Sequence, residues 1–318
     1  MQDGPMSEMT YRRLGGSGLA VSVVGLGCNN FGMRIDQDAT NAVVHAALDE
    51  GVTLFDTADS YGESEVMLAK ALGDRRDDVV IATKFATDLR GANGPDWGAR
   101  GSRRYIRTAV ERSLRRLGTD WIDLYQMHYP DPLTPIEETL GALSDLVHEG
   151  LVRYIGHSNY AGWQVADAAW TAETGGLERF ISAQNHYNLI ERDAEKELIP
   201  ACERFGVGLL PYFPLASGLL TGKYRRGQDA PEGGRIAAWG MVHLLSDANF
   251  DKVEALEAFG ADHGVSLLEV AIGGLASRPT VGSVIAGATS PDQLKANVAA
   301  GTWEPTAEER SALDAILG

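Results

Sequence analysis

Eight short apolar segments alternate with helical patterns along almost the whole chain, and this alternation restricts the fold more than any other feature. The segments cover 21–27, 52–56, 79–84, 121–128, 152–158, 181–185, 207–212 and 281–287. Between them apolar residues recur at helical spacing, as over 39–48, 105–117 and 136–147. Nearly continuous apolar strands are typical of a parallel sheet that is buried on both faces. Eight strand–helix units predict a closed (β/α)8 barrel.

A β-hairpin is predicted ahead of the barrel. Two short β-prone pieces flank the glycine-rich stretch 15–18, and we expect this hairpin to plug the bottom of the barrel. The 318 residues of the chain suit one such barrel, and no linker, repeat or low-complexity stretch divides them. We therefore expect a single domain over 1–318, with 1–9 as a flexible N-terminal extension.

Two connections, 85–102 and 213–250, are much longer than the usual loop between a strand and a helix. Both follow predicted barrel strands, so they belong to the C-terminal face, where the active sites of such barrels lie. Loops of this length usually have a function. We expect them to shape a substrate site.

Helix starts are marked by two hydroxyl–proline pairs, Thr134-Pro135 and Ser290-Pro291. A Ser or Thr N-cap accepts a hydrogen bond from a helical N–H. Proline suits the first helical position because the N–H that it lacks would have no partner there. Both pairs predict a helix that begins at the proline.

Charge and composition exclude several classes of protein. The 44 acidic and 28 basic residues give a net charge of -16, which disfavours nucleic acid as a partner. The apolar runs are short and broken by Gly or charge, and the start lacks the layout of a signal peptide, so we expect no membrane insertion. Cys28 and Cys202 form no CxxC pair, and the seven histidines lack metal-ligand spacing. We expect no metal and a cytoplasmic enzyme for a small molecule, monomeric or homo-oligomeric.

Four chemically complementary side chains stand at the ends of adjacent predicted strands. Asp56 ends the second strand, and Tyr61 follows it within FDTADSYGESE; Lys84 and His128 end the third and fourth strands. A nearby ammonium lowers the pKa of a phenol, and a carboxylate keeps a buried ammonium charged. A histidine can orient a substrate oxygen. The set predicts Tyr61 as a tuned proton donor facing a carbonyl, with Asp56 directed at Lys84.

Each of these residues taken singly has a purely structural explanation, as a helix cap, a solvated cation or a local hydrogen bond. Their combination favours chemistry, and a proton donor is naturally complemented by hydride transfer from a nicotinamide, since no serine or cysteine has a recognisable base. The segment GLGCNN at 25–30 lacks the third glycine of GxGxxG, which argues against a Rossmann site. The cofactor must be bound in another way.

The chain resembles the aldo-keto reductase family over nearly its whole length. The motifs that carry the resemblance, in family order, are GVTLFDTADSYGESE, VVIATKF, DLYQMHYPD, VRYIGHSNY, AQNHYNL, YFPLASGLLTGKY and VIAGATSPDQLKANV. The resemblance implies a barrel that binds NADP(H) across its rim and reduces aldehydes or ketones. It makes Tyr61 the general acid. Asp56 and Lys84 tune it, and His128 orients the carbonyl.

The resemblance also implies the cofactor contacts. Nicotinamide contacts fall on Ser158, Asn159, Gln184 and Tyr212. Pyrophosphate contacts fall on Ser217, Gly218, Lys223 and Arg235, and Leu215 is a further cofactor-binding residue. The adenosine 2′-phosphate falls near Thr289, Ser290, Gln293 and Asn297. A helix cap is the alternative for the Ser-Asn pair.

The adenosine end departs from the family pattern. Many relatives have Lys or Arg where Gly287, Ser290 or Gln293 stand here, and Ala296 replaces an acidic residue of some relatives. Fewer cations weaken discrimination for a phosphate. We expect NADP(H) to be preferred, with NAD(H) as the other cofactor it could use.

The substrate and two rival functions stay open. Candidates for a substrate pocket are Phe31, Phe85, Trp97, Tyr129 and Trp239, with loop packing as the alternative. Potassium-channel β subunits share the LLTGKY and GATS-like segments, so a cofactor-binding partner subunit with weak turnover is one rival. A metal-dependent isomerase or lyase is the other, but it needs clustered carboxylate and His ligands that the sequence lacks.

Overall fold

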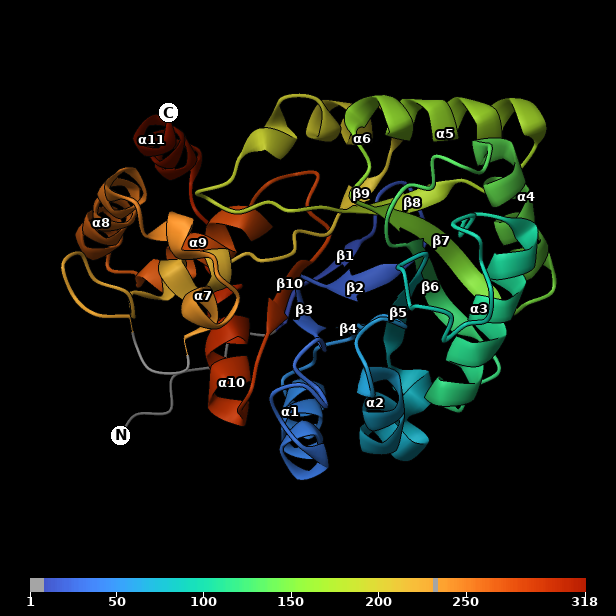
Figure 1. Cartoon of the computed structure of the whole chain (residues 1–318). Helices are drawn as coiled ribbons and strands as arrows, with labels where there is room; N and C mark the ends of the chain where they lie inside the picture. The colour runs from blue at the N-terminus through green and yellow to red at the C-terminus, as the bar shows by residue number, and fades with distance from the viewer. Residues whose placement is uncertain (1–8, 231–233) are drawn as a thin grey trace.

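The structure, a computed structural model, describes residues 9–230 and 234–318, so the expected N-terminal extension falls almost wholly outside the described residues (Figure 1). Short strands recur along the chain close to the predicted segments. The strands are β1 Tyr11–Arg13, β2 Ala20–Ser22, β3 Val24–Gly27, β4 Leu54–Asp56, β5 Val80–Phe85, β6 Ile122–Met127, β7 Val152–Ser158, β8 Phe180–Gln184, β9 Gly208–Leu209 and β10 Val284–Gly287.

The strands β3 to β10 form the predicted parallel barrel. In the described part of the chain, they make an eight-stranded sheet in the order β10-β3-β4-β5-β6-β7-β8-β9, and each neighbouring pair is parallel. A parallel bridge between Leu209 and Val281 joins the two ends of the sheet. The fold is therefore a (β/α)8 barrel, and all its strands point their carboxyl ends toward one rim.

Helices surround the strands, as Figure 1 shows. The α-helices are α1 Gln37–Asp49, α2 Ser64–Leu72, α3 Arg103–Leu117, α4 Ile136–His148, α5 Gly162–Gly175, α6 Leu198–Phe205, α7 Arg235–Ala238, α8 Asp247–His263, α9 Leu267–Ala276, α10 Pro291–Ala300 and α11 Ala307–Leu317. The 3-10 helices are η1 Gly73–Asp78, η2 Asp193–Glu195, η3 Ala216–Thr221 and η4 Val242–Leu245. The long connection 213–250 thus holds helical turns of its own, whereas 86–102 is built of turns and loops.

The N-terminal hairpin closes the bottom of the barrel, as predicted. β1 and β2 pair antiparallel, and Leu14 at their turn is fully buried in a cluster with Leu54 and Leu124 from the barrel interior. Gly15 has a φ of +57°, and a Cβ there would lie 2.5 Å from the carbonyl oxygen of Gly206. Only glycine allows this close approach of the turn to the barrel floor.

The first predicted strand, 21–27, is divided between two sheets. β2 ends at Ser22 and pairs with β1 in the hairpin, whereas β3 begins at Val24 and pairs with β10 and β4 in the barrel. The Ser22 hydroxyl donates to the carbonyl oxygen of Val24 (2.7 Å) across the break. An uninterrupted apolar run concealed this change of partner, because apolar periodicity does not record which strand is the neighbour.

One of the two predicted helix starts is correct. Ser290 is the N-cap of α10, its hydroxyl accepts from the backbone N of Gln293, and Pro291 is the first helical residue. At the other pair, Pro135 is itself the N-cap and α4 begins one residue later. The Thr134 hydroxyl is not used as a cap and instead donates to the carboxylate of Asp131 (2.6 Å), a charge-assisted hydrogen bond.

No helix in the described ranges is both long and apolar enough to cross a bilayer.

Candidate active site

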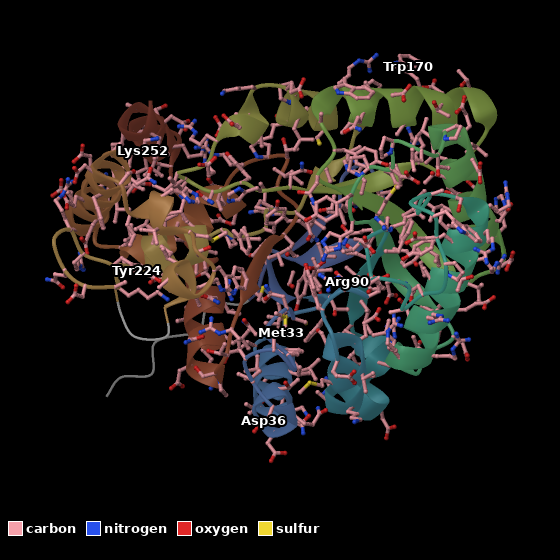
Figure 2. The ribbon with its side chains drawn as sticks, viewed as in Figure 1. Met33, Asp36, Arg90, Trp170, Tyr224 and Lys252 are labelled. Atoms are coloured by element: carbon pink, nitrogen blue, oxygen red, sulfur yellow. The ribbon has the colours of Figure 1, made fainter. Side chains whose placement is uncertain are left out.

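A cavity of about 700 Å³ opens at the carboxyl ends of the barrel strands, and most of the residues predicted for the site line it. It is bounded by strand ends and by the connections after β3, β6 and β9. In Figure 2, Met33, one of its lining residues, lies at the end of α1 that faces the strand ring, whereas Trp170 stands outside on α5. The predicted residues in its lining are Asp56, Tyr61, His128, Tyr129, Ser158, Asn159, Gln184, Tyr212, Leu215, Ser217, Gly218, Lys223, Arg235, Thr289, Gln293 and Asn297.

Lys84 lies fully buried beneath this lining and forms an ion pair with Asp56. The Nζ atom donates to Asp56 Oδ2 at 2.6 Å and to the carbonyl oxygen of Thr57 at 2.9 Å. Burial alone lowers the pKa of Lys84, but Asp56 and Tyr61 outweigh it and hold that pKa above its ordinary value. The prediction that Asp56 is directed at Lys84 is confirmed, and the ammonium stays charged inside the barrel.

Tyr61 lies next to this ammonium, with Lys84 Nζ 5.1 Å from the centre of its ring. Burial raises the pKa of Tyr61, and the charge of Lys84 lowers it but does not compensate, so the net shift is upward. The expected lowering is therefore wrong in its net direction. Sequence patterns do not reveal how completely a phenol is desolvated. At neutral pH the phenol keeps its proton, as a proton donor must.

His128 is a neutral imidazole in this site. Burial, followed by the charge of Lys84, lowers the pKa of His128 to about 3. Its ring lies edge-on to Tyr61, with 5.9 Å between centres, and its Nδ1 is 3.0 Å from the hydroxyl of Thr87. When Nδ1 accepts that hydroxyl hydrogen, Nε2 carries the ring proton and can donate to a carbonyl oxygen. No sequence signal marked Thr87.

The carboxylate of Asp56 also anchors two amides that face it across the barrel. Gln184 Nε2 donates to Asp56 Oδ1 at 2.7 Å, and Gln126 Nε2 donates to the same oxygen at 3.3 Å. Gln126 was missed, although a polar residue inside the apolar strand DLYQMH could have drawn attention to it. Asp56 thus accepts from Lys84 at one carboxylate oxygen and from the two amides at the other. These buried donors compensate the charge of Asp56 for the loss of water.

The residues predicted for the nicotinamide end form one hydrogen-bonded chain. Tyr212 donates its hydroxyl hydrogen to Asn159 Oδ1 (2.9 Å), and Asn159 Nδ2 donates to the carbonyl oxygen of His128 (2.9 Å). The Ser158 hydroxyl donates to the carbonyl oxygen of Gln184 (2.6 Å). The helix that follows begins at Gly162, so the alternative role of the Ser-Asn pair as its cap is excluded.

Three cations gather in another part of the cavity: Arg34, Lys223 and Arg235. Burial lowers the pKa of Lys223, and the charges of Arg235 and Arg34 lower it further. Burial and then Arg34 likewise lower the pKa of Arg235. The three positive charges repel one another, although the chain as a whole has a net charge of -16. A polyphosphate would relieve that repulsion, so these residues fit such a group. Arg34 was not predicted.

Gly218 allows the backbone to approach this cluster. Its φ is +98°, and a Cβ there would lie 2.5 Å from Cε of Lys223. Ser217 also has a positive φ, and its hydroxyl lies 3.2 Å from the sulfur of Met241. The 3-10 segment η3 therefore presents a tight turn rather than a regular helix next to the cations.

The predicted adenosine end contains mainly uncharged polar groups, in agreement with the few cations expected there. The Gln293 side chain accepts from the backbone N and the hydroxyl of Thr289, each at 2.9 Å. Asn297 Nδ2 lies 3.4 Å from the carbonyl oxygen of Gly287. Lys295, although basic, points toward Glu50 at 4.0 Å. Hydroxyl, amide and helix N–H groups line this end of the cavity.

Three of the aromatic residues predicted for the substrate pocket lie elsewhere. Phe31 and Phe85 are fully buried in the hydrophobic core, and Phe85 stacks on Tyr125. Trp97 is 76% exposed and packs under Arg104. The sequence does not fix whether a side chain at the end of a strand or in the loop after it faces the core, the cavity or solvent, which explains the error.

The other two, Tyr129 and Trp239, do line the cavity. Tyr129 stacks parallel to His128 with 5.0 Å between ring centres, and Trp239 packs against Phe213 and under Arg235. Both contribute aromatic surface to the cavity, Tyr129 beside His128 and Trp239 beside Arg235. Flat apolar groups suit such a surface.

In the two described ranges, no group of three or more His, Cys, Asp or Glu side chains is placed to hold a metal ion.

The similarity to known proteins agrees with this geometry. The model of the aldo/keto reductase family matches residues 23–317. A probable voltage-gated potassium channel subunit beta of Oryza sativa subsp. japonica is 38% identical over 303 residues, covering 92% of this chain and 91% of the relative. An uncharacterized oxidoreductase, YrpG, of Bacillus subtilis is 35% identical with the same coverage of both chains. The L-glyceraldehyde 3-phosphate reductase of Escherichia coli K12 is 33% identical, covering 92% of this chain and 88% of the relative. The chain belongs to the aldo/keto reductase family and is an NAD(P)H-dependent oxidoreductase.

Proposed function

We propose that this protein reduces aldehydes or ketones to alcohols with NADPH, and that Tyr61 is the general acid. One observation carries the proposal: a fully buried, charged Lys84 lies beside a phenol that keeps its proton and a neutral imidazole, all at one cavity. A buried ammonium favours the phenolate that forms when the phenol releases its proton. Burial of the Asp56–Lys84 ion pair costs desolvation free energy, which a purely structural role does not explain.

The four residues have distinct parts in the proposed reaction. Bound NADPH supplies a hydride to the carbonyl carbon. Tyr61 transfers its hydroxyl proton to the carbonyl oxygen, and Lys84 stabilises the phenolate that remains. Asp56 keeps Lys84 charged and in place, while His128 donates a hydrogen bond that orients the carbonyl oxygen.

The cofactor would be held by the predicted residues of the cavity lining. Ser158, Asn159 and Gln184 suit a carboxamide because they offer both donors and acceptors, and Tyr212 offers a flat face for the ring. Ser217, Gly218, Lys223 and Arg235 would hold the pyrophosphate, Leu215 would be a further cofactor contact, and Thr289, Gln293 and Asn297 would hold the adenosine end. Their common cavity supports this assignment.

The single domain, the small carbonyl substrate and the cytoplasm belong to the same proposal. Cys28 and Cys202 are both free and buried, which suits a reducing compartment. A monomer or homo-oligomer is compatible with a cavity built from one chain. The aromatic surface that Tyr129 and Trp239 contribute supports an aryl or otherwise apolar carbonyl compound.

The proposed activity is tested by NADPH oxidation with purified protein. A panel of carbonyl compounds should include 4-nitrobenzaldehyde, phenylglyoxal and methylglyoxal. We expect turnover that survives EDTA, because the chemistry assigned to the four residues needs no metal. Activity lost with EDTA and restored by a divalent cation would contradict the proposal.

NADPH should be preferred over NADH, because the adenosine end of the cavity offers hydroxyl and amide groups that suit a further phosphate. We expect kcat/KM with NADPH to exceed that with NADH by about tenfold or more. Both cofactors are to be compared at saturating carbonyl substrate. Equal values would show that the groups near Thr289 and Gln293 do not read the 2′-phosphate.

Replacing Arg235 by alanine should weaken cofactor binding. Loss of one charged donor to a phosphate costs about 1.5–3 kcal/mol, so the Kd for NADPH should rise at least about tenfold. Fluorescence titration of NADPH measures this without turnover. The matched control is Arg225→Ala, since Arg225 pairs with Glu257 outside the cavity. An equal loss in both variants would refute a specific role for Arg235.

A second function is supported by the relatives of Oryza sativa and Arabidopsis thaliana, which are 38% and 37% identical and named as probable voltage-gated potassium channel subunits beta. In this second function, the barrel binds the cofactor, associates with another protein and reduces carbonyl compounds only slowly. Tight NADPH binding, slow reduction of every carbonyl tested and a co-purifying partner would favour it.

A further inference from the structure

Asp59 is a buried acid in the loop that carries Tyr61, and the proposed reaction does not use it. Ser60 and Tyr61 line the cavity, but Asp59 turns away from it and is 8% exposed. Its backbone N donates to the carbonyl oxygen of Lys84 (3.1 Å). Asp59 thus connects the backbone of the Tyr61 loop to the strand end that supplies the buried ammonium.

The side chain of Asp59 joins this loop to the long connection 86–102. Asn93, which is 3% exposed, donates through Nδ2 to Asp59 Oδ2 at 2.9 Å. The same nitrogen lies 3.4 Å from the hydroxyl of Tyr105 on α3. A buried polar pair in an otherwise exposed stretch of turns fixes how that stretch packs against the Tyr61 loop.

The surroundings of Asp59 disfavour its charged form. The carboxylate of Glu65, 1% exposed, already accepts from Thr83 (2.7 Å) and Arg116 (2.6 Å). Asp59 Oδ1 is buried without a hydrogen-bond partner among the described residues. The titratable groups that interact with Asp59 are Glu65 of α2, Lys84 of β5, Tyr105 and Arg116 of α3, and Tyr125 of β6.

Burial, and then the charge of Glu65, raise the pKa of Asp59 to about 7, although Arg116, Asn93 and Lys84 lower it. The proposed catalytic groups titrate far from neutrality. The pKa of His128 is about 3, and those of Tyr61 and Lys84 lie above their ordinary values of 10.0 and 10.5. A change of activity near neutral pH would therefore have its origin outside these three residues.

We propose that Asp59 is a pH-sensitive positioning residue for Tyr61, whose neutral form keeps the Tyr61 loop packed on the connection 86–102 and whose ionisation loosens that packing. The ionised carboxylate is repelled by Glu65 and leaves one oxygen without a donor, so it gains by moving toward water. Residues 57–63 move with it, and Tyr61 loses its alignment with the carbonyl. The activity part of this inference rests on the proposed reductase function.

The first test is the pH dependence of carbonyl reduction between about pH 5 and about pH 9. We expect kcat of the wild type to fall by about threefold to tenfold as pH rises through about 7, with little change in the KM for NADPH. Asp59→Asn cannot ionise and keeps an acceptor for Asn93, so its profile should lack this fall. Asp88→Asn, an exposed acid in the same connection, should retain it.

A second variant moves the transition rather than abolishing it. Glu65→Gln removes the charge that repels the ionised carboxylate, so the fall in kcat should shift to lower pH. A merely structural role of Asp59 predicts no such shift. A fall that persists unchanged in Asp59→Asn, or that does not move in Glu65→Gln, overturns the proposal.

Hydrogen exchange gives a readout that needs no turnover. After correction for intrinsic rates, amides of 86–102 in the wild type should exchange faster at about pH 8 than at about pH 6, and those of Asp59→Asn should not. This result without any carbonyl turnover would support the positioning role of Asp59 and count against the reductase function. Equal exchange at both pH values in the wild type overturns the inference.

Discussion

Tyr61→Phe should reduce kcat for carbonyl reduction by about 10²- to 10⁴-fold, the usual contribution of a positioned general acid. The variant removes one hydroxyl and leaves the ring in its place beside Lys84 and His128. Because Tyr61 acts only when the proton moves, the Kd for NADPH should change by less than about twofold. Steady-state kinetics and fluorescence titration measure the two quantities separately.

Tyr154→Phe is the matched control, since Tyr154 belongs to β7 and lies next to the hairpin at the opposite end of the barrel. It should keep near wild-type kcat. Undiminished turnover in Tyr61→Phe would refute the assignment of the proton donor. A parallel loss of NADPH binding would instead show that Tyr61 supports the cofactor site.

Lys84→Met should abolish most activity and also destabilise the protein strongly. The substitution leaves Asp56 buried without its cation, and breaking a buried ion pair in this way costs about 3–5 kcal/mol. Because the pKa of Lys84 is raised in the folded state, the stabilising contribution of its bound proton is fully present at neutral pH. That contribution is lost only as pH rises through the folded pKa. Urea unfolding at neutral pH measures the loss.

The double variant Asp56→Asn with Lys84→Met separates stability from catalysis. Removing both charges should recover much of the lost stability, since no unpaired buried charge remains. Activity should stay as low as in Lys84→Met, because no ammonium is left to stabilise the phenolate. Lys196→Met is the surface control: its pair with Asp193 is exposed on both sides, and its loss should leave unfolding unchanged. Recovery of activity in the double variant would refute the role of Lys84.

Three of the four proposed catalytic residues were predictable because each stands where a buried strand ends. Parallel strands place their carboxyl ends at one rim, so Asp56, Lys84 and His128 had to approach one another once the barrel was recognised. Tyr61 follows the end of β4 by five residues, too few to carry it away from that rim. The direction of Asp56 toward Lys84 followed from charge and is confirmed at 2.6 Å.

The errors in the substrate pocket arose because the sequence does not show in which direction a side chain at or after a strand end points. Phe31 turns into the core and Trp97 turns outward, although both follow strands as Tyr129 does, and Phe85, the last residue of β5, also points into the core. Asp59 belongs to the loop between β4 and α2. Its burial against Asn93 depends on a connection whose conformation has no periodic signal.

What the sequence determined by itself is the order of strands and helices, the barrel and the set of polar residues at its rim, because apolar periodicity and strand direction are local properties. Only the tertiary structure decided which side chains share the cavity and which carry protons. The net upward shift of the Tyr61 pKa, the neutral state of His128 and the value near 7 for Asp59 all depend first on burial. Burial is produced by segments far apart in the chain, and no local pattern contains it.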